Sequence, residues 1–388
     1  MRRFTNSYGV FSVFLAFGVL LAGEGVHEAR AATWSSDFDH DGDVDLTDFS
    51  GFAACFNGPN RLPTTACAVA ADLDIDTDVD LLDFAVFTAC FNGPNRLPAC
   101  APDSPPYMVV IPAGEFQMGD TFSEGDFNEQ PVHAVHIDAF YMDATEVTKT
   151  FWDEVRAWAT ANGYSDLVVG ASRAGTHPVH TVNWFDCVKW CNARSQKDGR
   201  TPCYYTDSAL TMVYKTGEVE PYVNWDVDGY RLPTEAEWEK AARGGASGRR
   251  FPWSDSDLIQ HARANYYSWD YYTYDTSPTR GYHPLFIVYG SPHTSPAGYF
   301  APNGYGLYGM AGNVYELCND WYNSTYYSRT PYPHVNPHGP AGGSYRVHRG
   351  GFCHGYADVC RVAFRWYVDP DSRSTIIGFR CAVGTGGN

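Results

Sequence analysis

The alternation of hydrophobic and polar positions predicts short β-strands near the middle of this chain. Residues 108–116 (MVVIPAGEF) and 134–142 (AVHIDAFYM) carry apolar, often β-branched side chains at alternating positions. This pattern is typical of strands that have one buried face. Long stretches rich in Gly, Asn and Tyr lie between such segments and are typical of loops. The chain therefore favours a mixed α/β domain of short elements over a helical bundle.

Two segments carry the signals of a helix start. Thr234 followed by Glu237 forms a capping box, which predicts a helix over residues 235–243. Asn183 and Asp186 precede a second predicted helix, which carries two cysteines one turn apart. Both helices belong to the same long stretch as the predicted strands, so we expect one large domain.

The N-terminal segment has the pattern of an export signal. Two arginines precede an apolar run over residues 10–22, and residues 29–31 (Ala-Arg-Ala) offer a cleavage site between small residues. The alternative is a membrane anchor, but the run is too short to span a bilayer comfortably. We therefore predict a signal peptide over residues 1–31 and a secreted, periplasmic or cell-surface protein with no membrane span after cleavage.

Composition and charge narrow the classes of partner. The 388 residues are 44% hydrophobic and 16% aromatic, and the formal net charge is −18. Twelve Asp fall between positions 37 and 83, where Arg61 is the one Lys or Arg. No basic patch stands out, so nucleic-acid binding is not expected. A cluster of acid this dense needs a cation or full solvation.

The acidic cluster is a tandem repeat with a period of 35 residues. Each copy places carboxylates at every second position, as in an EF-hand-type loop that holds calcium from positions 1, 3, 5, 7, 9 and 12. Gly42 permits the sharp turn at position six of the first loop, whereas Thr77 takes that place in the second. The predicted calcium ligands are Asp37, Asp39, Asp41, Asp43 and Asp48 in the first loop and Asp72, Asp74, Asp76, Asp78 and Asp83 in the second.

Asp rather than Glu at position twelve makes this region, residues 35–100, similar to the dockerin module. A short apolar helix is expected after each loop, at residues 49–56 and 84–91. Dockerins bind cohesin domains, so the resemblance implies a cohesin-like or other protein partner. The alternative is an acidic, solvated linker.

Four cysteines occupy equivalent places in the two repeats. The simplest interpretation is one disulfide in each repeat, Cys55 with Cys67 and Cys90 with Cys100. The alternative is a zinc site, although neither spacing fits a zinc ribbon. Residues 101–106 (APDSPP) then form a linker to the large domain, residues 107–388.

Seven motifs in the large domain occur in the order typical of the formylglycine-generating enzyme (sulfatase-modifying factor) family, which the domain resembles over almost its whole length. They lie at residues 108–120, 131–148, 177–192, 229–245, 302–322, 348–351 and 377–383. The resemblance implies an irregular α+β fold, similar to C-type lectins, beside the small α-helical calcium-loop module.

The resemblance also implies disulfides and calcium sites. It pairs Cys191 with Cys381, and it places a second, lost bridge at Ala242 and Val362. Cys187, Cys203, Cys318, Cys353 and Cys360 are left without an implied partner, and Cys318 with Cys360 is one further pairing to consider.

One implied calcium site uses Asn265, without a clear counterpart for its second carboxylate. The other corresponds to Gly309, Gly312, Val314 and Glu316. Members of the family usually have an Asn or Asp oxygen at position 309, where this chain has Gly. Fewer ligands imply weaker calcium binding. The alternative is that Glu316 only hydrogen-bonds its own turn.

The chemistry of the family depends on two reactive cysteines, spaced C-x4-C after a GGS motif, that hold copper(I) and the substrate thiol. Here Phe352 replaces the serine, the loop is shorter, and the family's second cysteine falls on Ala357. Cys353 and Cys360 are the candidate catalytic pair, but they are seven residues apart rather than five. A displaced pair is poorly placed to bind one metal ion and a third sulfur.

Two functions are therefore open. The first is an active oxidase that converts a sulfatase cysteine to formylglycine with copper and oxygen. The second, which we favour, is a binding or scaffold protein that has lost the catalytic pair. It would use calcium for its repeats and a Tyr- and Trp-rich surface, including residues 266–289, to bind a sulfatase, a glycan or another partner. The alternative is that the rings of residues 266–289 only pack a loop.

Overall fold

The computed structural model describes residues 46–55 and 107–385. Helix α1 (Leu46–Cys55) lies in the first repeat and overlaps the helix expected at 49–56. The first calcium loop lies outside the described residues up to position 45, and its last predicted ligand, Asp48, falls in α1. The second repeat and the signal peptide also lie outside the described residues, as do Cys67, Cys90 and Cys100. Cys55 is disulfide-bonded, and its pairing with Cys67 stays a prediction.

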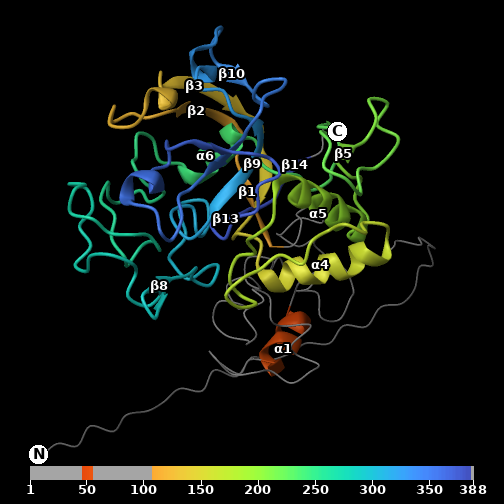
Figure 1. The fold of residues 1–388 in the computed structure, drawn as a ribbon, viewed down its shortest axis with the longest axis horizontal. Helices are drawn as coiled ribbons and strands as arrows, with labels where there is room; N and C mark the ends of the chain where they lie inside the picture. The colour runs from red at the N-terminus through yellow and green to blue at the C-terminus, as the bar shows by residue number, and fades with distance from the viewer. Residues whose placement is uncertain (1–45, 56–106, 386–388) are drawn as a thin grey trace, which may run out of the picture.

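Three small sheets form the framework of the large domain (Figure 1). The first has the antiparallel order β1-β4-β14, and its strands are β1 (Met108–Ile111), β4 (Phe140–Asp143) and β14 (Ala382–Gly384). The second has the order β10-β3-β2, and its strands are β2 (Gly114–Met118), β3 (His133–Ile137) and β10 (His334–Val335). The last described strand, β14, therefore pairs with β4, which separates it from the first strand of the domain.

The third sheet has four strands in the order β12-β11-β9-β13. They are β9 (Tyr315–Trp321), β11 (Arg346–Arg349), β12 (Trp366–Val368) and β13 (Ile377–Gly378). β9 pairs antiparallel with β11 and parallel with β13. Two-residue strands make two further hairpins: β5 (Tyr204–Tyr205) with β6 (Tyr222–Val223), and β7 (Ile287–Val288) with β8 (Ser291–Pro292).

Each long strand expected from the alternation is two strands in the structure. Pro112 and Ala113 separate β1 from β2, and Asp138 and Ala139 separate β3 from β4. The chain changes sheets at both places. Pro112 cannot donate to a ladder, which explains the first break. At the second break the alternation also shifts by one residue, from buried Val135 and Ile137 in β3 to buried Phe140 and Met142 in β4. A one-residue shift turns the apolar side chains to the other face, which the prediction of one continuous strand overlooked.

The helices begin where their capping residues predict. The Asp186 amide donates to Asn183 Oδ1 at 2.8 Å, and Asn183 N donates back to Asp186 Oδ2, so α5 (Trp184–Lys197) begins one residue after Asn183. Asp186 therefore lies in the first turn of this helix rather than before it. A second capping box opens α6 (Glu235–Ala242), which ends one residue before the predicted limit. Helix α4 (Lys149–Ala161) is capped by its preceding threonine.

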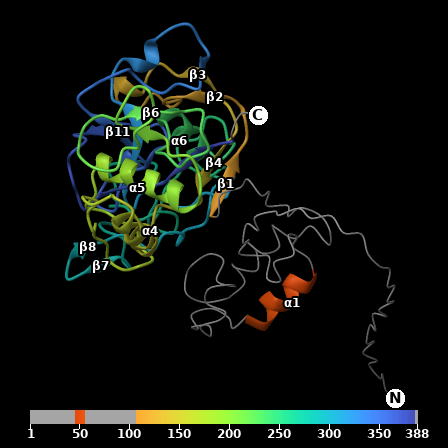
Figure 2. The same cartoon turned by 90° about the vertical axis from the view of Figure 1, so that its right-hand side faces the viewer.

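A core of indoles joins the helices to the C-terminal segment. Helices α4 and α5 lie side by side in both ribbon views (Figures 1 and 2). Between them Trp152 stacks on Trp190 with ring centroids 5.8 Å apart, and Phe379 meets both rings edge-on. All three side chains are fully buried. Short 3₁₀ turns, η1 (Phe127–Glu129), η2 (Tyr326–Ser328) and η3 (Ala357–Cys360), complete the elements.

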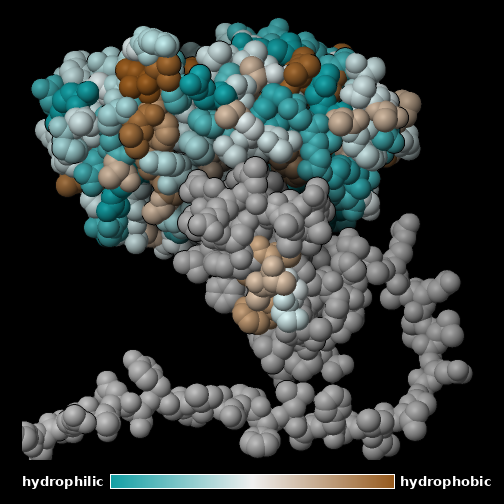
Figure 3. Space-filling model, turned by 90° about the horizontal axis from the view of Figure 1, so that it is seen from below, coloured by the Kyte–Doolittle hydropathy of each residue, from teal (hydrophilic) through white to brown (hydrophobic). Residues whose placement is uncertain are grey.

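The surface is mostly hydrophilic. Figure 3 shows polar residues over most of the visible described face, with small hydrophobic patches between them. Within the described ranges no helix has both the length and the apolar character that crossing a bilayer requires.

Candidate functional site

The loop after β11 holds both candidate catalytic cysteines. Gly350 and Gly351 turn the chain with φ angles of 92° and 81°. A side chain at Gly351 would come within 2.9 Å of Cys360 Sγ, so only glycine fits there. Cys353 follows, and its amide donates to Asn313 O at 2.9 Å. Cys360 closes η3.

Both thiols of this loop point into the protein. Cys353 is 2% exposed and Cys360 is 0% exposed, and the latter lies in a cluster with Phe251 and Tyr266. Burial raises the pKa of Cys353 to about 12 and that of Cys360 well above its usual value. The sulfur that binds a metal or attacks a substrate is the thiolate. Burial thus favours the protonated thiol over the thiolate at both positions.

No other cysteine of the large domain is a better candidate for an accessible catalytic thiol. The seven cysteines between residues 187 and 381 are all buried and free. Cys191 and Cys381 nevertheless lie together, with 3.5 Å between their Sγ atoms, and the predicted bond between them is not closed in the structure. Ala242 and Val362, the positions of the lost bridge, are buried in one shared hydrophobic cluster. The pairing of Cys318 with Cys360 is likewise absent.

Glu316 lies at the centre of the second implied calcium site. It is fully buried, and Arg380 donates to it through Nε and a terminal nitrogen, each at 2.7 Å. Trp238 Nε1 donates to the same carboxylate at 2.7 Å. The charge of Glu316 therefore has a partner in the protein.

A second buried carboxylate, Glu146, occupies the space beside Gly309. A side chain at Gly309 would come within 2.5 Å of Glu146 Oε2, so this carboxylate fills the place of the side-chain oxygen that the family usually has there. Oε1 accepts from Asn313 Nδ2 at 2.8 Å, while Oε2 is buried without a hydrogen-bond partner. Burial and the neighbouring Glu316 raise the pKa of Glu146 to about 7, against the effect of Arg380.

This arrangement fits a hard cation in part. Two carboxylates face one guanidinium, which leaves one negative charge and one oxygen unsatisfied. Calcium prefers six to eight oxygen ligands, and the backbone carbonyls of Gly312 and Val314 are the further candidates. Among the residues that the structure describes, no group of three or more His, Cys, Asp or Glu could hold a metal by itself. Sequence reasoning missed Glu146, although it lies in a quoted motif.

The first implied calcium site is organised differently. Asn265 is buried, its side-chain amide donates to His293 O at 2.9 Å, and its carbonyl accepts from Asn313 N at 2.8 Å. The buried carboxylate that follows it in the chain is Asp275, which pairs with Arg280 and accepts from several loop donors. The charge of Asp275 is thus paired within the protein, and no contact joins this carboxylate to Asn265 among the described residues.

Four histidines in the motifs at residues 131–148 and 177–192 contact polar groups of the protein. His177 Nδ1 lies 2.9 Å from Thr294 Oγ1 and His133 Nδ1 lies 3.0 Å from Pro131 O. His180 contacts the Thr181 hydroxyl at 2.9 Å, and His136 lies 3.3 Å from Asp138. None of these contacts indicates a metal site.

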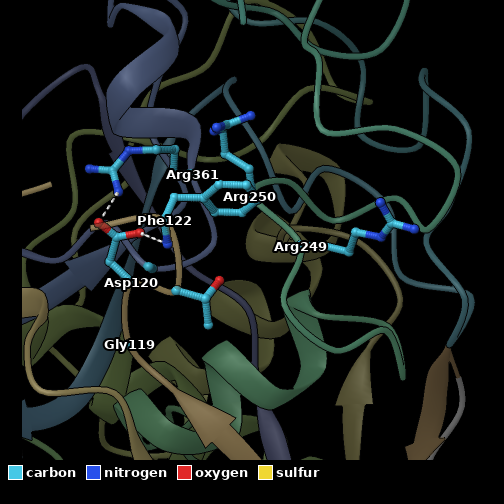
Figure 4. A pocket seen from close by; sticks show the side chains of 8 residues that line it. Gly119, Asp120, Phe122, Arg249, Arg250 and Arg361 are labelled. Carbon is cyan, nitrogen blue, oxygen red and sulfur yellow. Dashed lines mark hydrogen bonds and ion pairs between the residues drawn. The ribbon is translucent and has the colours of Figure 1, made fainter. Parts of the chain in front are cut away.

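An arginine-lined pocket offers no free cation for an anionic ligand (Figure 4). Arg361 binds Glu129 through two hydrogen bonds of 2.7 and 2.8 Å. Arg250 lies over the Phe122 ring and pairs with Glu124, and Arg249 pairs with Asp257. Each of these three guanidinium groups is paired with a carboxylate of the protein. The arginines therefore stabilise the fold around the pocket and leave no unpaired cation for a ligand.

Comparison with known proteins agrees with the order of the motifs. Residues 95–385 match the family model described as the sulfatase-modifying factor enzyme 1-like domain. The chain is 37% identical over 305 residues to a formylglycine-generating enzyme of Streptomyces coelicolor, covering 73% of this chain and 91% of that protein. It is 32% identical over 298 residues to the mouse inactive C-alpha-formylglycine-generating enzyme 2, covering 72% and 87%.

Solved structures have the same α+β fold. The Treponema denticola variable protein 1 superposes with a TM-score of 0.54 at 29% identity, over 71% of this chain and 94% of that one. PvdO from Pseudomonas aeruginosa gives 0.52 at 26% identity, over 71% and 94%. Sequence relatives thus include proteins named as active and as inactive.

Proposed function

The chain belongs to the sulfatase-modifying factor family, and we propose that it is an exported, non-catalytic member that binds a partner rather than oxidising a sulfatase cysteine. The observation that carries this proposal is the burial of Cys353 and Cys360. Copper(I) chemistry needs two thiolates facing a cavity that also admits the substrate sulfur. Here burial raises the pKa of both thiols, which holds them protonated.

Calcium is the metal that we propose for this protein. The two Asp-rich loops have the ligand spacing of EF-hand-type sites, and a cohesin-like protein is their proposed partner. In the large domain, Glu146 and Glu316 with the carbonyls of Gly312 and Val314 would hold a further ion. Calcium there would neutralise the excess charge of two buried carboxylates beside Arg380.

The second candidate function is the formylglycine-generating oxidase. The 37% identity to a protein of that name favours it. In that case Cys353 and Cys360 would have to leave their buried positions to bind copper. No other cysteine of the large domain would replace them, because the remaining five are also buried.

A thiol count combined with a copper(I) titration distinguishes the two functions. Native, reduced protein is treated with a thiol reagent and titrated against a copper(I) chelator, then incubated with a sulfatase-derived cysteine peptide and oxygen. We expect no rapidly reacting thiol, no stoichiometric copper and no formylglycine, and the Streptomyces coelicolor relative serves as the active control. Tight one-to-one copper binding that disappears in Cys353→Ala would overturn the proposal.

A further inference from the structure

A cluster of aromatic side chains lies on the loop that follows Asn265. Trp269 is at its centre: its ring stacks on Tyr271 with centroids 5.0 Å apart and lies 5.1 Å from Tyr356. Tyr272 meets both Trp269 and Tyr271 edge-on. Tyr356 comes from the loop that also carries Cys353 and Cys360, so two segments about ninety residues apart in the sequence build one aromatic surface.

These rings are exposed although they contact one another. Trp269 is 42% exposed, Tyr271 is 71% exposed and Tyr356 is 41% exposed. A large aromatic ring stabilises the folded state most when it is fully removed from water. Three partly exposed rings therefore leave apolar surface in contact with water. Binding a ligand on the rings would remove part of this surface from water.

The surface is rigid before any ligand arrives. The buried carboxylate of Asp275 accepts from Trp269 N at 2.9 Å, Ser268 Oγ at 2.9 Å and the Tyr266 hydroxyl at 2.7 Å. Arg280 donates to the same carboxylate. On the other segment, Gly355 O accepts from Tyr267 N at 2.7 Å. Preorganised rings lose little conformational entropy on binding.

Acidic side chains accompany the rings. Asp270, between Trp269 and Tyr271 in the sequence, is exposed. Asp358 accepts from the Tyr272 hydroxyl, and its Oδ1 is buried. Arg280 is the cation at this surface and is already held by Asp275. An anionic ligand would therefore find no unpaired arginine among these residues, and this disfavours nucleic acids and sulfated or phosphorylated ligands.

We propose that the surface formed by Trp269, Tyr271, Tyr272 and Tyr356 binds a neutral oligosaccharide of pyranose sugars. The C–H faces of a pyranose ring are apolar and pack on the electron-rich faces of aromatic rings. The sugar hydroxyls would donate to the exposed carboxylate of Asp270. This inference rests on the proposed binding function and gives that function a site and a class of ligand.

Calorimetric titration of the full secreted chain with cellohexaose, xylohexaose, mannohexaose and chitohexaose tests the inference. We expect at least one to bind, and Trp269→Ala and Tyr271→Ala each to raise its Kd at least about tenfold. Tyr271 is the more exposed ring, so its variant keeps the fold. Trp366→Ala is the matched control, because Trp366 is 40% exposed on β12, outside the cluster, and this variant should keep the wild-type Kd.

An arginine-rich peptide is titrated in the same way. The inference is overturned if none of the four sugars binds, or if both cluster variants still bind the sugar as the wild type does. It is also overturned if only the peptide binds, which would assign the surface to cationic proteins. The titration is independent of the thiol and copper measurements. Absent sugar binding with no copper and no formylglycine removes the glycan site alone, whereas formylglycine production removes the non-catalytic function.

Discussion

Arg380 donates two hydrogen bonds to Glu316 at 2.7 Å, and neither side chain is exposed to solvent. The pair joins the C-terminal IGFRC segment to the first residues of β9, across 64 positions of the chain. Arg380 also donates to the carbonyls of Asp143, Ala144 and Tyr308. One guanidinium therefore connects three separate segments around the Glu146 site.

Replacing Arg380 with Leu should strongly destabilise the large domain, because it leaves Glu316 buried without a cation. We expect a loss of about 3–5 kcal/mol in the free energy of unfolding, measured by urea denaturation. Arg263→Gln is the matched control, since Arg263 pairs with an exposed carboxylate and should leave the unfolding midpoint unchanged. Equal effects of the two variants would contradict a special role for the buried pair.

Glu146→Gln should change how stability depends on pH and calcium. Because the pKa of Glu146 is raised to about 7, the folded state binds more protons than the unfolded state between about pH 4.5 and 7. Without calcium, stability conferred by the protonated group falls as pH rises through this window, and the Gln variant should lack this fall.

Calcium should restore the stability of the wild type at pH 8 more than that of Glu146→Gln, as measured by thermal unfolding of the full chain. The difference between the two proteins isolates this pocket from the Asp-rich repeats, which both retain. An identical calcium shift in wild type and variant would show that Glu146 binds no calcium.

Acid should destabilise the protein through its buried histidines. Burial lowers the pKa of His177 and of His261 to about 4. The unfolded chain binds a proton at each near pH 6.5, so stability present above that pH is lost as pH falls toward 4. The loss is at most about 3 kcal/mol for each histidine.

The double variant His177→Gln/His261→Gln should therefore show a flatter loss of stability between pH 6.5 and 4 in urea denaturation series. This slope has the opposite sign to that of Glu146, so the two effects are separable by their variants. An unchanged acid slope would mean that other groups cause the acid sensitivity.

Export into an oxidising compartment should join Cys191 to Cys381, whose sulfurs already lie side by side. Peptide mapping by mass spectrometry without reduction should find this cross-link. Its loss in Cys191→Ser should cost about 2–4 kcal/mol of stability. Cys203→Ser is the control, because the Cys203 thiol donates to Gly229 O and its loss removes no predicted bridge. A cross-link from Cys187 to Cys381 instead would contradict the pairing.

Local signals in the sequence determined the starts of the helices and the family. A capping box such as Thr234 with Glu237 closes within one turn, so four residues encode it. Alternation identified the right segments as strands but not the breaks at Pro112 and Asp138, since sheet membership depends on partners far along the chain. The order of the motifs was sufficient for the family.

The tertiary structure decided what the sequence left open. Spacing alone did not show whether Cys353 and Cys360 face solvent, whereas the packed loop buries both side chains. Glu146 was not recognised as a neighbour of Glu316, and Tyr356 was not recognised as a neighbour of Trp269. Each of these contacts joins segments about ninety or more residues apart, and the packing of the whole chain, rather than any local pattern, brings them together.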